Sequence, residues 1–316
     1  MKTIVPNYYS RFACIAGACR HSCCIGWEID IDAESFARYQ TLPGKTGEKL
    51  RQNTEMKGGC AHFRMQGAQE RCPMLNDEGL CELILTYGED ALCQICADHP
   101  RFRHFWTGRT EIGLGLCCEE AARLILSQEE IVQLTAIADD GREDAADEEE
   151  TALLRVRSEL FQLMQDRSRP VEARVESLLA LVHAKPADFA WDEWIPILLD
   201  LERLDERWAE LIAPLQDASS ALSLPGALQI PMEQLMIYLL YRHLPEARAD
   251  GDARGHILLC CLLWLLAAQL CVHYAFTLSE LTECCRMLSS EIEYSEDNIA
   301  ALLDEIAWAF APQDFY

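Results

Sequence analysis

Cysteine thiols dominate the chemistry that this 316-residue sequence could perform. Eleven of its sixteen cysteines lie in the first 118 residues, and most of them occur in short runs. The runs contain Cys14, Cys19, Cys23 and Cys24, then Cys72 and Cys81, then Cys93 and Cys96, then Cys117 and Cys118. Thiols this close in sequence form disulfides, bind metal or carry redox chemistry. Which of these applies largely decides what the protein does.

Metal binding is the interpretation that the spacing favours. The opening Met-Lys-Thr-Ile-Val-Pro contains no apolar signal-peptide core, so we expect a cytoplasmic, reducing environment in which structural disulfides are rare. Adjacent pairs such as Cys23 and Cys24 seldom bridge each other, because disulfide geometry is restrictive. Thiolate-rich sites select zinc or an iron–sulfur cluster, and spacing alone leaves both open. A redox role for Cys93-x2-Cys96 is less favoured, because no βαβ unit surrounds the pair.

Short elements joined by loops must position these cysteines. Glycines and turn signals are frequent up to residue 118, and short helices are expected only around 33–39 and 89–96. A helix follows Glu119, and Ser127 with Glu130 predicts the capped start of another. We therefore expect a cysteine-rich, loop-rich metal-binding domain over 1–126, a helix and acidic linker over 127–150, and an all-helical domain over 151–316.

The fold class is expected to be mainly α. Apolar periodicity predicts helices near 151–166, 170–184, 191–212, 230–244, 255–275, 278–290 and 295–310. The unbroken apolar run over 257–268 is shorter than the ~20 residues of a membrane span, so it predicts a core helix and no membrane span. The five cysteines in these stretches, Cys260, Cys261, Cys271, Cys284 and Cys285, are expected to be small buried hydrophobes.

Charge is distributed unevenly along the chain. Residues 1–118 hold 13 Lys and Arg against 14 Asp and Glu, whereas the rest hold 14 against 38. An acidic surface of this size argues against nucleic acid as a partner, because phosphate contacts need clustered Lys and Arg. It is compatible with a lysine-bearing protein substrate, and equally with a role in solubility alone.

Four motifs carry a resemblance to a known family. They are M-K-T-I-V-P-N-Y-Y-S-R-F-A-C-I-A-G-A-C-R-H-S-C-C-I-G-W-E-I-D-I-D, C-P-M-L-N-D-E-G-L-C-E-L, L-C-Q-I-C-A-D-H-P-R-F and C-E-E-A-A-R-L-I-L. Together they resemble the flagellin lysine-N-methylase (FliB) family, within a broader set of cysteine-cluster proteins thought to bind zinc or an iron–sulfur centre. The resemblance covers residues 1–126, and beyond them only helical character and length agree.

The resemblance implies methyl transfer from S-adenosylmethionine to lysine side chains of flagellin, together with a cysteine-ligated centre, taken to be [4Fe–4S]. Position by position it assigns as ligands Cys14, Cys19, Cys23, Cys24, Cys72, Cys81, Cys93, Cys96 and Cys118. The family usually has Ser-Cys-Pro where this chain has Cys117-Cys118-Glu119, so Cys117 is expected to be a bystander. Nine ligands leave two readings open: two metal sites, or one site plus structural thiols.

Further site residues follow from this reading. Residues 27–32 alternate apolar and acidic side chains, which predicts a short strand or a carboxylate-lined edge that receives the substrate lysine. Glu28 and Asp30 are the candidates to neutralise or deprotonate that lysine, because an amine must lose a proton before it attacks. Arg101 and Arg103 could hold a cofactor carboxylate by bidentate contact, or simply lie on the surface.

An alternative function remains open, because no Rossmann-type methyltransferase motif is visible. In that alternative, the chain is a zinc- or iron-stabilised protein-interaction module without methyltransferase activity, whose acidic helical domain docks a partner.

Overall fold

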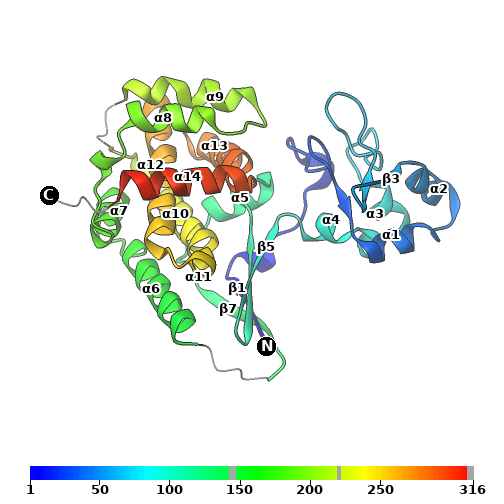
Figure 1. Ribbon diagram of the computed structural model, residues 1–316, viewed down its shortest axis with the longest axis horizontal. Coiled ribbons are helices and arrows are strands. Elements are labelled where there is room, and N and C mark those ends of the chain that lie inside the picture. The colour runs from blue at the N-terminus through cyan, green and yellow to red at the C-terminus, as the bar shows by residue number, and fades with distance from the viewer. Residues whose placement is uncertain (142–146, 219–221, 312–316) are drawn as a thin grey trace. The chain divides into compact units, whose positions relative to one another are not determined.

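The computed structural model describes residues 1–141, 147–218 and 222–311, and over these the chain forms two compact units (Figure 1). The cysteine-rich unit comprises residues 13–101 and 118–120. The helical unit comprises 1–12, 102–117 and the residues from 121 onward. The units therefore interleave along the chain, because the cysteine-rich unit is inserted after the first strand of the helical unit. The domain ranges 1–126, 127–150 and 151–316 stay a prediction.

The cysteine-rich unit is built on a small antiparallel sheet with short helices. Its strands are β2 (Asp30–Ile31), β3 (Thr54–Lys57) and β4 (Cys60–Phe63), in the order β2-β4-β3. Its helices are α1 (Ala33–Tyr39), α2 (Gly44–Gln52), α3 (Glu82–Tyr87) and α4 (Gln94–Asp98). The Asp32 carboxylate caps α1 by accepting from Ser35 N at 2.9 Å, and it also accepts from Gln94 N at 2.8 Å. One carboxylate thus fixes the starts of both α1 and α4.

The core of this unit mixes apolar side chains with the candidate ligands. Ile29, Ile31, Tyr39, Leu50, Phe63 and Met74 are buried together with Cys72 and Cys93. The prediction of a short strand within 27–32 is confirmed for β2, and the alternation holds, since Ile29 and Ile31 are buried while Asp30 is exposed.

The helical unit contains a sheet that the sequence reading missed. Its strands are β1 (Lys2–Pro6), β5 (Arg101–Trp106), β6 (Arg109–Leu114) and β7 (Leu134–Asp139), in the order β5-β6-β1-β7. Strand β1 pairs parallel with β6, where Lys2 faces Arg109, and antiparallel with β7, where Pro6 faces Leu134.

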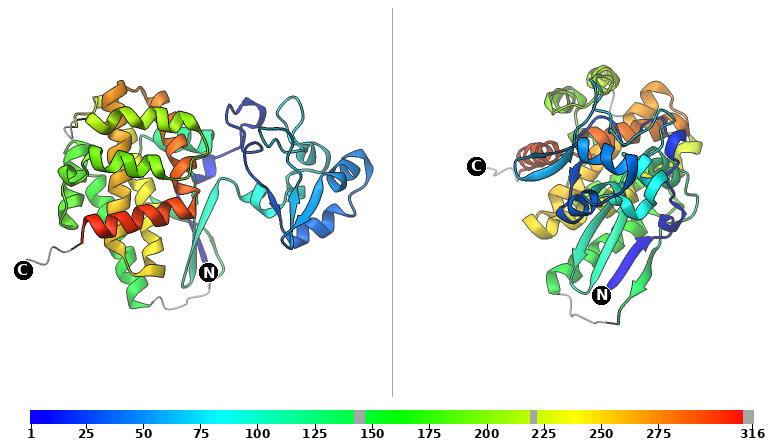
Figure 2. Two further views of the ribbon diagram at one scale, coloured as in Figure 1. Left: turned by 45° about the horizontal axis from the view of Figure 1, so that its top comes forward. Right: turned by 90° about the vertical axis from the view of Figure 1, so that its right-hand side faces the viewer.

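Helices form the rest of this unit (Figure 2). They are α5 (Glu119–Leu126), α6 (Glu148–Met164), α7 (Val171–Leu181), α8 (Trp191–Asp200), α9 (Glu206–Ile212), α10 (Gln229–His243), α11 (Ala247–Asp250), α12 (Ala253–Tyr274), α13 (Leu278–Leu288) and α14 (Glu296–Ala309). Short 3₁₀ segments lie at Tyr9–Arg11, Pro186–Asp188, Ala213–Asp217, Gly226–Leu228 and Leu244–Glu246, and a π-helical turn lies at Ser289–Glu293. Two further 3₁₀ segments, Ala16–Ala18 and Glu89–Ala91, belong to the cysteine-rich unit. The mainly α fold class is confirmed.

Helix α12 is the core of the helical unit. By length and composition its 22 residues could cross a membrane. However, 94% of its most apolar 18-residue stretch is buried inside the protein. The Trp264 indole donates to Met232 O on α10 at 2.8 Å, which satisfies its polar atom inside the core. The expected core helix over 255–275 is confirmed, and all five C-terminal cysteines are buried, as predicted.

Three local predictions are corrected by the structure. The helix expected to start at Ser127 is absent among the described residues there, because β7 follows and pairs with β1. The single helix expected over 191–212 is broken into α8 and α9, because Asn298 and Glu291 side chains accept from Glu202 N and Leu204 N between them. Residues 142–146 of the expected acidic linker lie outside the described residues, and α6 begins inside it at Glu148.

Candidate metal centre

All nine predicted cysteine ligands lie in the cysteine-rich unit, and local structure positions each run. Cys93 immediately precedes α4 and Cys96 lies within it, so the two thiols are one helical turn apart. Cys81 immediately precedes α3. The Cys72 amide donates to Cys24 O at 2.8 Å, which ties the second cysteine run to the first.

Glu119 ties Cys118 to the first run. Its carboxylate accepts from Arg20 N at 2.9 Å and from Arg20 Nε at 2.8 Å. Residues 118–120 therefore belong to the cysteine-rich unit, although the chain has just left strand β6 of the other unit. This clamp brings Cys118 beside Cys19 and Cys23, which lie about a hundred positions earlier in the sequence.

Electrostatic interactions between the thiols divide the nine cysteines into two groups. The first-run group is Cys14, Cys19, Cys23 and Cys118, in which Cys23 interacts with Cys14 and Cys118 and Cys19 interacts with Cys118. The central group is Cys24, Cys72, Cys81, Cys93 and Cys96, in which Cys72 interacts with Cys24, Cys81 and Cys93. Cys23 and Cys24 are hydrogen-bonded and join the two groups.

Burial and mutual hydrogen bonds set the protonation of these thiols. Burial raises the pKa of Cys72 to about 12 and that of Cys19 to about 11. The Cys96 thiol donates to Cys93, which lowers the pKa of Cys93 to about 7 and raises that of Cys96. The adjacent pair behaves in the same way: a hydrogen bond from Cys23 lowers the pKa of Cys24 to about 7. Each pair therefore offers one thiolate near neutral pH.

The other cysteines are placed differently. Cys117 belongs to the helical unit, where its side chain hydrogen-bonds with Tyr294. Cys60 begins strand β4, outside the two cysteine groups. A sequence reading cannot make this separation between Cys117 and Cys118, because it depends on where the chain crosses from one unit to the other.

The predicted catalytic carboxylates Glu28 and Asp30 converge on a histidine that the sequence reading passed over. His62 Nδ1 lies 2.7 Å from Asp30 Oδ1 and 2.9 Å from Glu28 Oε1. Asp30 and His62 are cross-strand partners in β2 and β4. Lys57, at the end of β3, places its Nζ 3.1 Å from Glu28 Oε2. The register of three strands therefore brings two carboxylates, one imidazole and one ammonium together, and that register was the missing signal.

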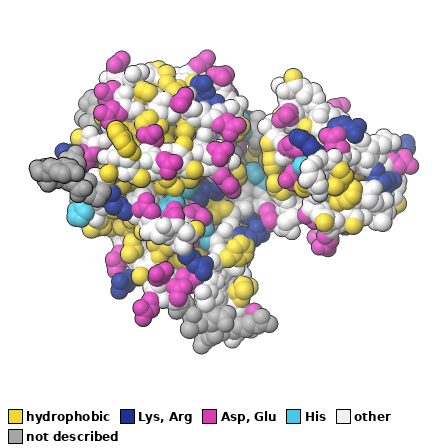
Figure 3. Space-filling view, viewed as in Figure 1, with side chains coloured by type: hydrophobic (Ala, Val, Ile, Leu, Met, Phe, Trp, Pro, Cys, Tyr) yellow, Lys and Arg dark blue, Asp and Glu magenta, His cyan; other side chains and the backbone are white. Residues whose placement is uncertain are grey.

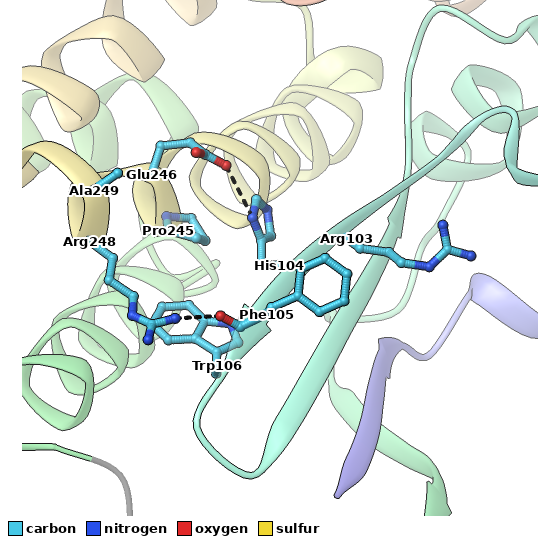
Figure 4. A pocket seen from close by; sticks show the side chains of 8 residues that line it. All are labelled: Arg103, His104, Phe105, Trp106, Pro245, Glu246, Arg248 and Ala249. Carbon is cyan, nitrogen blue, oxygen red and sulfur yellow. Dashed lines mark hydrogen bonds and ion pairs between the residues drawn. The ribbon is translucent and has the colours of Figure 1, made fainter. Parts of the chain in front are cut away.

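The two predicted cofactor arginines belong to different units. Arg101 donates to Ala97 O at 3.3 Å within the cysteine-rich unit. Arg103 lies on β5 in the helical unit, at a cavity of about 390 Å³ lined by Arg103, His104, Phe105, Trp106, Pro245, Glu246, Arg248 and Ala249 (Figure 4). The Arg103 side chain extends away from the Glu246 carboxylate, whereas His104 Nδ1 lies 3.2 Å from Glu246 Oε1 (Figure 4). Arg248 hydrogen-bonds with Phe105 O. The structure thus does not bring the two arginines together as one described site.

Comparison with known proteins gives partial matches. The chain is 29% identical over 135 residues to a lysine-N-methylase of Salmonella typhimurium, a match that covers 41% of this chain and 34% of that protein. It is 27% identical over 135 residues to the lysine-N-methylase of Salmonella choleraesuis, with the same coverage. It is 28% identical over 134 residues to the flagellar biosynthetic protein FliU of Salmonella muenchen, covering 41% of this chain and 79% of that protein.

The matched part of the chain thus spans about a third of the length of the two lysine-N-methylases. No family model matches the chain. No solved structure matches it. The resemblance to the flagellin lysine-N-methylase family, predicted from the cysteine motifs, is confirmed as a similarity to curated proteins of that kind.

Proposed function

We propose that this chain is a cytoplasmic protein-lysine N-methyltransferase that uses S-adenosylmethionine to methylate lysine side chains of flagellin. The observation that carries the proposal is the 135-residue similarity to proteins named lysine-N-methylase. The name of a third relative, a flagellar biosynthetic protein, supports flagellin as the substrate. The acidic side chains spread over the visible face of the helical unit (Figure 3) are electrostatically compatible with a substrate that presents lysines.

The proposed metal centre is a [4Fe–4S] cluster held by the central group. An all-sulfur donor set of buried and half-buried cysteines fits an iron–sulfur cluster or zinc. A [4Fe–4S] cluster takes four thiolates, and the central group offers five cysteines from which they can come.

Cys72, Cys81, Cys93 and Cys96 would hold that cluster, with Cys24 beside them. When bound, it would supply fixed cross-links between loops that carry little regular structure of their own. The first-run group would form a second thiolate site, so that the nine candidates divide into two sites. We propose a positioning role for the centre, because attack of an amine on the methyl group of a sulfonium needs no metal.

The methyl transfer itself needs a neutral lysine amine. The nitrogen lone pair forms the new N–C bond while the C–S bond of the cofactor breaks and its electron pair returns to sulfur. The proton that leaves the ammonium group must pass to a base. Glu28 and Asp30 are proposed for this role, because both are partly exposed and Glu28 already binds one ammonium group, that of Lys57, at 3.1 Å.

The cofactor is proposed to bind at the cavity beside β5. Phe105, whose side chain is exposed, offers a surface for stacking an adenine, and Glu246 offers a carboxylate for ribose hydroxyls. Arg103, on the rim of the cavity, is proposed to bind the carboxylate of the cofactor. Arg101 serves as the control when this role of Arg103 is tested, because it lies only two residues away but belongs to the cysteine-rich unit.

The deciding experiment is methylation of flagellin by the full chain, purified and reconstituted without oxygen. Intact mass of flagellin after incubation with S-adenosylmethionine should show additions of 14 Da per methyl group, about the mass of one CH₂. Arg103→Gln should weaken binding of S-adenosylmethionine at least about tenfold in calorimetry, whereas Arg101→Gln should not. Unchanged flagellin mass with a metal-loaded, folded protein would overturn the methylase and favour the interaction module.

A further inference from the structure

Strands β2 and β4 bring together a second set of metal-binding side chains that contains only one cysteine. One donor atom from each of Asp30, Cys60 and His62 lies within 4.8 Å of the others. Asp30 faces His62 across the sheet, and Cys60 precedes His62 by two positions, so both side chains of β4 project from the same face. Sheet geometry therefore fixes the three donors before any ion binds.

The histidine ring is held in the orientation that metal-binding histidines adopt. His62 Nε2 lies 3.2 Å from the backbone oxygen of Lys57, so this nitrogen carries the proton and donates it to the carbonyl. A histidine that donates one ring N–H to a carbonyl presents its other nitrogen as an unprotonated ligand. That other nitrogen, Nδ1, is the one that faces the carboxylates.

His62 Nδ1 is buried and has no hydrogen-bond partner, although two carboxylate oxygens lie within 3 Å of it. The residue as a whole is 8% exposed. Two carboxylate oxygens at such distances need a positive charge between them, which either a proton on the ring or a bound metal ion supplies. The Lys57 ammonium is close to Glu28, so it does not supply that charge to Asp30.

We propose that Asp30, Cys60 and His62 bind one divalent ion of the zinc class, separately from the nine-cysteine centre, so that Glu28 is the carboxylate left to act as a base when the ion is bound. The donor set of one imidazole, one thiolate and one carboxylate is typical of zinc and of cobalt as its substitute, and not of magnesium or calcium. Cys60 loses its thiol proton to solvent when the ion binds. Asp30 is 57% exposed at its side chain, so the fourth position of the ion is open to water or to a substrate group.

The proposal does not depend on the methylase reading, because its test measures metal and not methylation. The full chain, with its iron reconstituted, is titrated with zinc against a chromophoric chelator, and bound zinc and iron are counted by mass spectrometry. Wild type should bind one zinc equivalent more than the Cys60→Ser variant, and likewise one more than the His62→Gln variant. Loss of a direct ligand should weaken binding by more than the ~10–100-fold typical of outer partners.

Glu55→Gln is the matched control. Glu55 is the β3 partner of His62 and pairs with Arg64 at 3.2 Å, outside the three-donor set. This variant should keep the zinc equivalent, and all variants should keep the iron content and far-ultraviolet circular dichroism of wild type. Equal zinc in wild type, Cys60→Ser and His62→Gln would overturn the proposal. Cobalt should give the same ranking through its visible d–d bands, and unchanged circular dichroism and iron content distinguish a variant that lacks a ligand from one that misfolds.

Discussion

Arg157 on α6 and Glu111 on β6 form a bidentate ion pair with both side chains buried. Arg157 Nη1 donates to Glu111 Oε2 at 2.6 Å, and Nη2 donates to Glu111 Oε1 at 2.8 Å. Arg109 adds a second cation 2.9 Å from the same carboxylate. The pair links the sheet of the helical unit to its first long helix.

Removing one partner of this pair should destabilise the helical unit. Arg157→Ala leaves a buried carboxylate with only Arg109, and breaking such a pair costs about 3–5 kcal/mol in the free energy of unfolding. Urea unfolding followed by circular dichroism measures the loss. Arg155→Ala, on the exposed side of the same helix, should change stability by less than about 0.5 kcal/mol. Equal midpoints for the two variants would refute the role of the pair.

Acid should weaken the helical unit through Glu293. Burial alone would raise the pKa of Glu293, but Arg242 and a 2.6 Å hydrogen bond from His243 outweigh it and lower the pKa from 4.5 to about 2. Because the folded pKa lies below the unfolded one, the stabilisation is complete above pH 4.5 and is lost as the pH falls toward 2. At 1.36 kcal/mol per unit, this amounts to about 3 kcal/mol.

The test compares wild type with Glu293→Gln across that range of pH. The difference in unfolding free energy should be largest near pH 6 and should shrink as the pH falls from 5 to 2.5. Parallel curves for the two proteins would contradict the assigned pKa, since the variant lacks the titrating group.

Replacing a buried cysteine of the central group should remove bound metal, whereas replacing a buried cysteine in the core of the helical unit should not. Cys72→Ala should lose the absorbance near 400 nm, together with iron and acid-labile sulfide, because Cys72 is placed among four other thiols. Cys271→Ala, on α12, is the matched control and should retain the metal content of wild type. Full iron content in Cys72→Ala would remove this residue from the centre.

Two glycines of the helical unit should respond oppositely to alanine. A Cβ on Gly113 would lie 2.1 Å from the Phe102 ring, so Gly113→Ala should cost about 1–3 kcal/mol by overpacking. A Cβ on Gly226 meets nothing within 4 Å, so Gly226→Ala should be neutral or slightly stabilising. Thermal unfolding of both variants checks the contrast, and equal shifts would contradict it.

The same contacts explain the two glycines of the G-L-G-L sequence at residues 113–116. Gly113 lies against the ring of Phe102, and a Cβ on Gly115 would meet the Tyr294 hydroxyl. These glycines make room for aromatic rings. The sequence could not predict this, because both rings come from other elements of the chain.

Helices and the short strand β2 were predictable from local pattern, whereas the strands of the helical unit were not. The expected helix over 33–39 coincides with α1, whose Asp32 cap is local, and α12 was marked by its apolar run. Strands β1 and β7 depend on pairing between residues more than a hundred positions apart, so their short sequences carried no distinguishing period. Likewise, the sequence identified Glu28 and Asp30 as candidate site residues. Their convergence on His62 could not be predicted, because it depends on the register of β2 with β4.

The order of strands in the helical unit determines which parts of the chain can fold while it is still being synthesised. Strand β1 is synthesised before the other three strands of its sheet, and its partners end at Leu114 and Asp139. At roughly 5–20 residues per second, β1 stays unpaired for on the order of ten seconds. Within that interval the whole cysteine-rich unit, up to Cys118 and Glu120, has already been synthesised. The inserted unit can therefore fold on the nascent chain before the last strand of the host sheet has been synthesised.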